Sequence, residues 1–170
     1  NKKKDDVFTI LYLGRIVKYK GLDVLIRAVK ILQFKIENLE LKILVVGDGD
    51  FKKDCEQLVR DLDLKNVEFV ATVRPEEIGY YYERASCFVL SARFLWSSGV
   101  PAEAWGFTVN EALSAGLPVI ATDAVAAADD LITDGINGFK IKPDDPDALA
   151  EKIKLLIENP ATLLKMSNAA

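Results

Sequence analysis

Short apolar runs alternate with amphipathic segments along most of this chain, and this alternation limits the folds open to it. In residues 21–34 the apolar side chains recur at the i, i+3, i+4 spacing that places them on one face of a helix. The apolar runs between such segments are nearly continuous, which is typical of parallel strands buried on both faces. We therefore predict an α/β fold: a Rossmann-like open parallel β-sheet with helices on both faces.

The predicted elements follow one another through short connections. The strands are predicted at residues 7–14, 41–47, 67–73, 87–91 and 118–122. The helices are predicted at residues 21–34, 52–64, 75–85, from about 105 onward, 125–133 and 146–159. Residues 92–104 are predicted to form a loop. No internal repeat or low-complexity stretch interrupts this pattern.

Length and charge narrow the class of protein. The 170 residues suffice for one domain with a core and are too few for two ordinary ones, so we expect residues 1–170 to form a single domain. The net charge of −4 argues against a nucleic-acid partner, because binders of the phosphate backbone carry a basic excess. No apolar run approaches the ~20 residues that span a bilayer, and no signal peptide is visible.

The cysteine and histidine content limits the chemistry. Cys55 and Cys87 are not clustered and belong to no metal-binding motif, which favours reduced thiols and a cytoplasmic location. The chain has no histidine, so it contains neither a Ser-His-Asp triad nor a histidine-ligated metal.

Glycine and polar residues follow the predicted strands at the points where these strands end. They are Gly14-Arg15, Gly47-Asp48-Gly49, residues 72–74 and Ser91. In open parallel sheets the ligand lies outside the carboxyl ends of the strands. We therefore expect these positions to converge on one site.

The loop at residues 14–21 carries two cations, Arg15 and Lys20, immediately before a helix. A guanidinium can bind two phosphate oxygens at once, and a lysine supplies a movable point charge. Together they suit a diphosphate whose charge grows as it leaves. The alternative is an ordinary strand–helix loop with solvated cations.

The Gly47-x-Gly49 sequence after the second strand partly matches a dinucleotide fingerprint, but Lys52 occupies the third glycine position. A tight turn that needs glycine dihedral angles explains it better, although close approach of a ligand to the backbone stays open. A nicotinamide-dependent oxidoreductase is therefore disfavoured.

Two carboxylates, Glu103 and Glu111, flank a Trp-Gly-Phe turn. On one continuous helix they would lie about 12 Å apart, too far to share a proton or a metal ion. That separation suits an elongated ligand with hydroxyls at both ends, since a carboxylate can accept both hydroxyls of a vicinal diol. The amides of Gly106 and Phe107 could receive an anion at the helix start. The alternative for Glu111 is a glutamate that only faces solvent.

Two aromatic segments remain. Phe94, Leu95 and Trp96 are expected either to pack on their own domain or to form a docking surface. The run Tyr80–Tyr82 has helical spacing and is expected to be core and helix surface, without a chemical role.

Taken in order, these segments resemble the C-terminal domain of a family 4 glycosyltransferase (glycosyl transferases group 1), one half of the two-Rossmann GT-B fold. The resemblance covers nearly all of the chain. It rests on residues 14–21, 45–49, 67–73, 103–123 and 131–139.

The resemblance implies a role for each candidate residue. Arg15 and Lys20 would bind the donor diphosphate, and Glu103 would hold hydroxyls of the transferred sugar; these three are the candidate catalytic residues. Glu111 would hold the ribose diol. The other implied donor-binding residues are Gly14 and Gly47 in the loops, Val73 and Arg74 facing the base, and Gly106 and Phe107 along the sugar–phosphate link.

The resemblance also implies the reaction and the partners. Members of the family retain anomeric configuration and bind a nucleoside diphosphate sugar without a metal or other cofactor; no DxD-type motif occurs in a suitable loop here. The N-terminal acceptor domain and the closing C-terminal helix are expected to be absent, so any peripheral membrane contact would come from the missing half. The alternative is a non-catalytic binding or interaction module of the same fold. It is suggested by the aromatic loop at residues 92–102 and by the alanines at 126–128 and Asp130, where many relatives have glycines and a glutamate.

Overall fold

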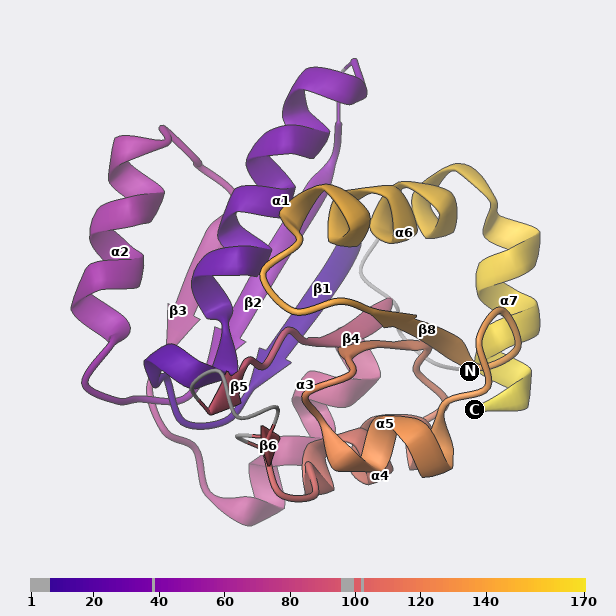
Figure 1. The fold of residues 1–170 in the computed structure, drawn as a ribbon. Helices are drawn as coiled ribbons and strands as arrows, with labels where there is room; N and C mark the ends of the chain where they lie inside the picture. Colours follow the sequence, from indigo (N-terminus) through magenta and orange to yellow (C-terminus); the bar gives the residue numbers. More distant parts are fainter. Residues whose placement is uncertain (1–6, 38, 96–99, 102) are drawn as a thin grey trace.

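The computed structural model describes residues 7–37, 39–95, 100–101 and 103–170 (Figure 1). Its main feature is an all-parallel sheet in the order β3-β2-β1-β4-β7-β8. The strands are β1 Phe8–Leu13, β2 Leu41–Val46, β3 Val67–Val70, β4 Cys87–Leu90, β7 Val119–Thr122 and β8 Gly138–Ile141. The predicted Rossmann-like α/β fold is therefore confirmed.

Helices connect these strands. They are α1 Leu22–Lys35, α2 Lys52–Asp61, α3 Ile78–Arg84, α4 Phe107–Ser114, α5 Ala126–Leu131, α6 Pro146–Glu158 and α7 Pro160–Ala169. Two 3₁₀ turns, η1 Lys18–Lys20 and η2 Pro75–Glu77, precede α1 and α3. None of the helices among the described residues combines the length and apolar character needed to cross a bilayer.

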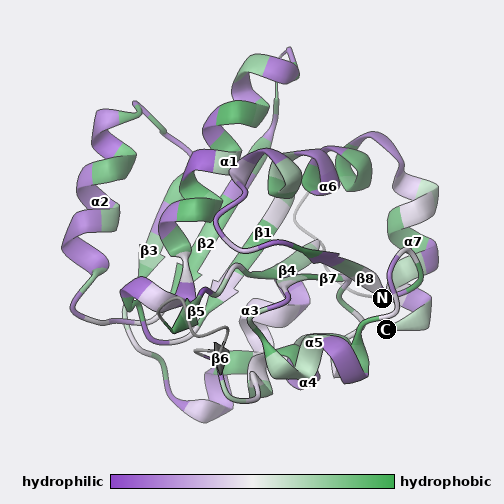
Figure 2. Cartoon of the chain, viewed as in Figure 1, coloured by the Kyte–Doolittle hydropathy of each residue, from purple (hydrophilic) through white to green (hydrophobic). Residues whose placement is uncertain are grey.

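The sheet separates two hydrophobic cores, because alternate side chains of a strand point to opposite faces. Ile10 and Tyr12 of β1 pack with α1 and α6, whereas Leu11 and Leu13 pack with α3, α4 and α5. Figure 2 shows the strands as a hydrophobic centre and α2 as a largely hydrophilic helix at one side. Burial on both faces accounts for the continuous apolar runs in the sequence.

Some element boundaries differ from the prediction. The third strand ends at Val70 instead of residue 73, because the partner strand β2 ends at Val46 and Gly47 then donates the last hydrogen bond to the Val70 carbonyl. The predicted loop 92–104 contains a short antiparallel pair, β5 Phe94–Leu95 with β6 Val100–Pro101. Trp96 lies outside the described residues. The sequence analysis assigned no structure to β8 and α7.

Strand order reverses its direction at β1. From β1 the chain proceeds to β2 and β3 on one side and then returns to β4 on the other side of β1. Ligands of such sheets bind beyond the carboxyl ends of the strands at this switch point. The loop of residues 14–21 lies at this switch point.

Gly21 fixes that loop against the end of β4. It has a φ of 70°, and a Cβ added there would lie 1.8 Å from the Ser91 carbonyl oxygen. The Ser91 hydroxyl also donates to the Gly21 carbonyl at 2.7 Å. Only glycine allows this approach.

We predict that Gly21→Ala lowers the free energy of unfolding by about 3 kcal/mol, from dihedral strain and backbone overlap together. The matched control is Gly79→Ala in α3, where an added Cβ meets nothing within 4 Å; it should raise stability by up to about 1 kcal/mol. Urea unfolding monitored by circular dichroism measures both. Equal effects of the two substitutions would contradict the docking role of Gly21.

Candidate functional site

A cavity of about 200 Å³ lies beyond the carboxyl ends of β1, β2 and β3. Residues 13–15, 46–48 and 72–73 line it from the three strand ends, and Ile78 of α3 completes the wall. The expected convergence of strand ends on one site is thus seen for Gly14, Arg15, Gly47 and Val73. A cavity at this place has the position of a ligand site in an open α/β sheet.

The cavity combines an apolar floor with a polar rim. Its apolar residues, Leu13, Val46, Val73 and Ile78, belong to the core under α3 and α4. Arg15 and Asp48 supply the charged rim, and both residues are exposed. Such a slot can bury a flat ring and bind polar groups at its edge.

Arg74 is not part of this cavity. Its side chain is 77% exposed and forms an ion pair with Glu77 at 3.1 Å. The Glu77 carboxylate also accepts from the Arg74 amide, and these hydrogen bonds lower the pKa of Glu77. Of the two residues predicted to face the base, only Val73 lines the cavity.

The glycines after β2 serve the contact between two loops. A Cβ on Gly47 would lie 2.0 Å from the Gly14 carbonyl oxygen, and one on Gly49 would lie 2.2 Å from that of Ile16. The Ile16 amide donates to the Asp48 carbonyl at 2.8 Å. Close backbone packing therefore accounts for this Gly-x-Gly sequence without a ligand.

Lys20 and Glu103 form an ion pair beside Gly14. Lys20 Nζ lies 2.9 Å from Glu103 Oε2, and the side chains are only 14% and 17% exposed. A Cβ on Gly14 would lie 3.4 Å from Lys20 Nζ, so the cation is adjacent to the loop that lines the cavity. The structure thus brings Glu103, from a distant part of the sequence, to two predicted site residues of the 14–21 loop, Gly14 and Lys20.

Glu103 does not share a helix with Glu111. Gly106, with a φ of 93°, precedes α4, which starts at Phe107. Glu103 instead forms an isolated parallel bridge with Val125. The spacing argument for a continuous helix is therefore wrong, and the two carboxylates occupy separate segments.

The alanine-rich segment at 126–128 supports the Glu103 loop. The amides of Ala126 and Ala127, at the start of α5, donate to the carbonyls of Glu103 and Trp105 at 3.3 and 2.9 Å. Ala127 and Ala128 are fully buried. Small side chains here allow α5 to pack closely on the loop.

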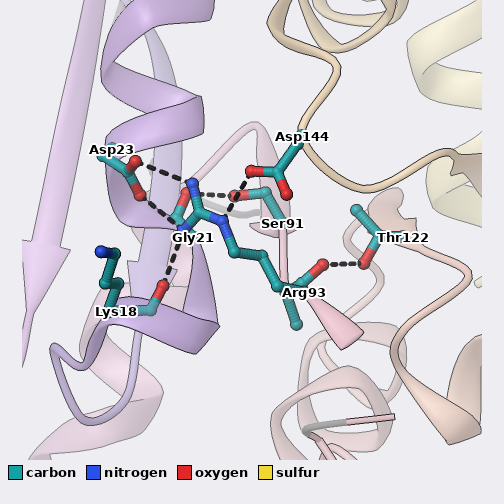
Figure 3. A network of polar contacts seen from close by, with 8 residues as sticks. Lys18, Gly21, Asp23, Ser91, Arg93, Thr122 and Asp144 are labelled. Atoms are coloured by element: carbon teal, nitrogen blue, oxygen red, sulfur yellow. Dashed lines mark hydrogen bonds and ion pairs between the residues drawn. The ribbon is translucent and has the colours of Figure 1, made fainter. Parts of the chain in front are cut away.

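Arg93 anchors the cationic loop from the end of β4 (Figure 3). Its guanidinium donates to both Asp23 oxygens at 2.9 and 2.8 Å, to Asp144 at 2.6 Å and to the Lys18 carbonyl at 2.6 Å. Its amide donates to the Tyr19 carbonyl at 2.7 Å. Burial alone would lower the pKa of Arg93, but hydrogen bonds and the charges of Asp23 and Asp144 outweigh it and raise this pKa.

The sequence analysis missed Arg93. The one signal in the sequence was a cation two residues past the strand predicted at residues 87–91. The hydrogen-bond partners of Arg93 lie 51 to 75 residues away from it in the sequence. By binding the η1 turn, Arg93 fixes the segment from which Lys20 reaches Glu103.

Arg15 is held through its backbone and its side chain. The Tyr12 hydroxyl donates to the Arg15 carbonyl at 3.0 Å, and burial raises the pKa of this tyrosine. The Arg15 guanidinium donates to the Tyr19 hydroxyl at 3.0 Å. The exposed guanidinium therefore stays at the rim of the cavity.

Glu111, Gly106 and Phe107 lie on or next to α4. The exposed Glu111 carboxylate accepts a hydrogen bond from Tyr82 of α3 at 2.8 Å, so it is not merely solvated. Among the described residues, nothing accepts from the amides of Gly106 and Phe107, which begin this eight-residue helix. These amides have the orientation that attracts anions to a helix start.

The described residues hold no group of three or more histidine, cysteine, aspartate or glutamate side chains placed to bind a metal ion. The prediction of a metal-independent site stays a prediction.

We predict that Arg93→Gln lowers the free energy of unfolding by about 2–3 kcal/mol, because it leaves the partly buried Asp23 without its cation. For Arg93→Lys the free energy of unfolding should lie between those of Arg93→Gln and the unsubstituted chain, since an ammonium keeps the charge but cannot bind both Asp23 oxygens in the same fork. The control is Arg74→Gln, which removes an exposed ion pair and should cost less than about 1 kcal/mol. Equal losses in urea unfolding for Arg93→Gln and Arg74→Gln would contradict the anchoring role.

Comparison with known proteins identifies the family. Residues 1–170 match the family model described as glycosyl transferases group 1. An uncharacterized glycosyltransferase of Haemophilus influenzae is 30% identical over 161 residues, which are 94% of this chain and 42% of that protein.

Solved structures give the same fold. The C-terminal domain of the glycosyl transferase group 1 family protein LpcC from Francisella tularensis is 26% identical, with a TM-score of 0.80 over 95% of this chain and 81% of that one. Anabaena Alr3699/HepE in complex with UDP and glucose is 23% identical, with a TM-score of 0.82 over 96% of this chain and 42% of that one. The chain thus spans about two fifths of the Haemophilus and Anabaena proteins. The match over all of its residues shows that this chain belongs to the glycosyl transferases group 1 family and has the fold of a GT-B C-terminal domain.

Proposed function

We propose that this chain is the donor-binding half of a retaining glycosyltransferase, which transfers a sugar from a nucleoside diphosphate sugar to an acceptor. One observation carries the proposal: the apolar-floored cavity beyond β1, β2 and β3 adjoins the Lys20–Glu103 pair through Gly14. The cavity that can take a flat ring, the Lys20 cation and the Glu103 carboxylate thus lie one after another along one edge of the sheet. A nucleoside diphosphate sugar presents a base, a diphosphate and hydroxyls in the same order.

The base is assigned to the cavity. Val73 and Ile78 offer apolar surface to a ring, and Asp48 offers an acceptor at the rim. The Anabaena protein, which shares the fold, is in complex with UDP and glucose, and this supports a nucleotide as the ligand.

The diphosphate is assigned to Arg15, Lys20 and the amides of Gly106 and Phe107. In the transfer, the bond between the anomeric carbon and the diphosphate breaks, and the diphosphate leaves with the bonding electrons. An acceptor hydroxyl then gives its proton to the departing diphosphate, and its oxygen forms the new bond to the same face of the sugar in a retaining reaction. Cations and helix-start amides stabilise the negative charge that develops on the leaving group.

Glu103 is assigned to hydroxyls of the transferred sugar and Glu111 to the ribose diol. Glu103 Oε2 is bound to Lys20, so a diphosphate that draws on Lys20 must share it with this carboxylate. Hydroxyl groups of a sugar would donate hydrogen bonds to Glu103 and so replace those that it loses when Lys20 turns to the diphosphate. The acceptor and its binding residues are assigned to another part of the protein, and the isolated chain is expected to show no transfer.

A non-catalytic module is the second candidate. It is favoured by the α5 amides, which bond to the Glu103 and Trp105 carbonyls instead of being open to a ligand. Joining the chain to an N-terminal half and measuring donor hydrolysis and transfer separates the two, since the second candidate shows neither.

We also infer a cytoplasmic location. It is supported by Cys55 and Cys87, two buried thiols in separate elements, α2 and β4.

We predict that isothermal titration detects weak binding of at least one of UDP, GDP and ADP, or of their sugars, to the folded chain. Phosphate at equal concentration is the control for simple ion binding. A folded sample that binds none of these nucleotides would overturn the site assignment.

We predict that Arg15→Ala and Lys20→Ala each weaken binding of the nucleoside diphosphate about tenfold or more, the effect of one charge-assisted hydrogen bond. Affinity for the corresponding monophosphate should change much less, because these cations are assigned to the diphosphate. Arg74→Ala is the matched control, since Arg74 is exposed and lies outside the cavity. Equal losses for monophosphate and diphosphate would contradict the assignment.

A further inference from the structure

Glu111 has a hydrogen-bond partner, Tyr82, to which the proposed function assigns no role. The Tyr82 hydroxyl of α3 donates to Glu111 Oε2 at 2.8 Å, across a separation of 29 residues. No other side chain among the described residues bonds to Glu111. One carboxylate oxygen is therefore held by the protein, while Oε1 and the second lone pair of Oε2 can accept from a ligand.

Tyr82 is a rigid donor. Its side chain is 4% exposed and belongs to the core with Val109 and Ala112 of α4. Its ring lies 6.2 Å from that of Phe88 in β4. Packing on several sides fixes the ring, so the hydroxyl keeps one position relative to α4.

Tyr82 is also linked to the cavity. It lies one helical turn after Ile78 on the same face of α3, and Ile78 forms part of the cavity wall. One short helix thus supplies both a wall of the cavity and the group that orients Glu111.

The phenol stays protonated. Burial raises the pKa of Tyr82, and the hydrogen bond to the Glu111 carboxylate raises it further. Tyr82 therefore donates and the carboxylate accepts, with no exchange of roles in the physiological range.

We propose that Tyr82 is a positioning residue that holds the Glu111 carboxylate for a ribose diol and so makes the site selective for ribonucleotides over 2′-deoxyribonucleotides. The inference rests on the proposed function of Glu111. A carboxylate fixed in one rotamer meets both hydroxyls of a vicinal diol with little loss of conformational entropy. A 2′-deoxyribose offers one hydroxyl fewer, and an oriented acceptor then loses a partner.

A purely structural role makes a different prediction. If Tyr82 only fills the core, its loss affects folding and lowers the affinity for ribonucleotide and deoxyribonucleotide by the same factor. If it orients Glu111, its loss changes the ratio of the two affinities. This ratio separates the two roles.

The experiment uses Tyr82→Phe, which retains the ring and removes the hydroxyl. The ligands are the diphosphate among UDP, GDP and ADP that the unsubstituted chain binds and its 2′-deoxy analogue. We expect ribonucleotide affinity to fall about three- to tenfold, because Glu111 loses its fixed position and part of its hydrogen bonding to the diol, with little change for the 2′-deoxy analogue. The matched control is Tyr81→Phe, since no described residue bonds to the Tyr81 hydroxyl; it should leave both affinities unchanged. Thermal unfolding of each variant verifies folding.

A double-mutant cycle with Glu111→Ala, which removes the acceptor of the Tyr82 hydroxyl, tests whether the effect passes through Glu111. In the Glu111→Ala background, Tyr82→Phe should no longer alter the ratio. The inference is overturned if the unsubstituted chain binds the diphosphate and Tyr82→Phe leaves the ratio intact, or lowers both affinities equally. Absence of binding by the unsubstituted chain overturns the proposed function itself, so the two failures are distinguishable.

Discussion

The geometry of the candidate site depends on the guanidinium of Arg93. It joins the η1 turn, the start of α1 and the loop before α6 (Figure 3). Asp23 and Asp144 would repel each other without a cation between them. A planar guanidinium, with donors in fixed directions, binds both Asp23 oxygens together with Asp144 and a carbonyl, and these four hydrogen bonds exceed the three donors of an ammonium. The position of Lys20 follows from this arrangement.

Close packing of backbone against backbone is the second constraint. The loops after β1 and β2 pass each other at Gly14–Gly47 and Ile16–Gly49, and the loop end at Gly21 meets β4. These approaches leave no space for a side chain, so the loops have little freedom to shift. Backbone packing at the strand ends therefore shapes the cavity, whereas Arg93 fixes the position of Lys20 beside it.

Much of the fold could be predicted from the sequence, because burial on both faces of a parallel sheet produces continuous apolar runs such as residues 41–46. The strand β8 was not assigned, since Gly138–Ile141 is short and contains Lys140, and its place at the sheet edge comes from pairing with β7. Gly14, Arg15, Gly47 and Val73 line one cavity, as expected for the carboxyl ends of neighbouring parallel strands, whereas Gly49, Arg74 and Ser91 do not line it. The partner of each side chain could not be predicted from the sequence, because the contacts of Lys20 with Glu103 and of Tyr82 with Glu111 join distant segments. Tyr82 was interpreted as core, which is correct, but its hydroxyl bonds to Glu111.

The Lys20–Glu103 pair gives the site a means of rejecting simple anions. Without a ligand, the two charges balance each other in surroundings that exclude most water. An inorganic ion that drew Lys20 to itself would leave a poorly solvated carboxylate without a partner, at a cost in free energy. A ligand that carries hydroxyl donors beside its anionic group avoids this cost, since it supplies partners for both side chains. On our assignment, abundant cellular phosphate is therefore a weak competitor for a site that is built around a cation.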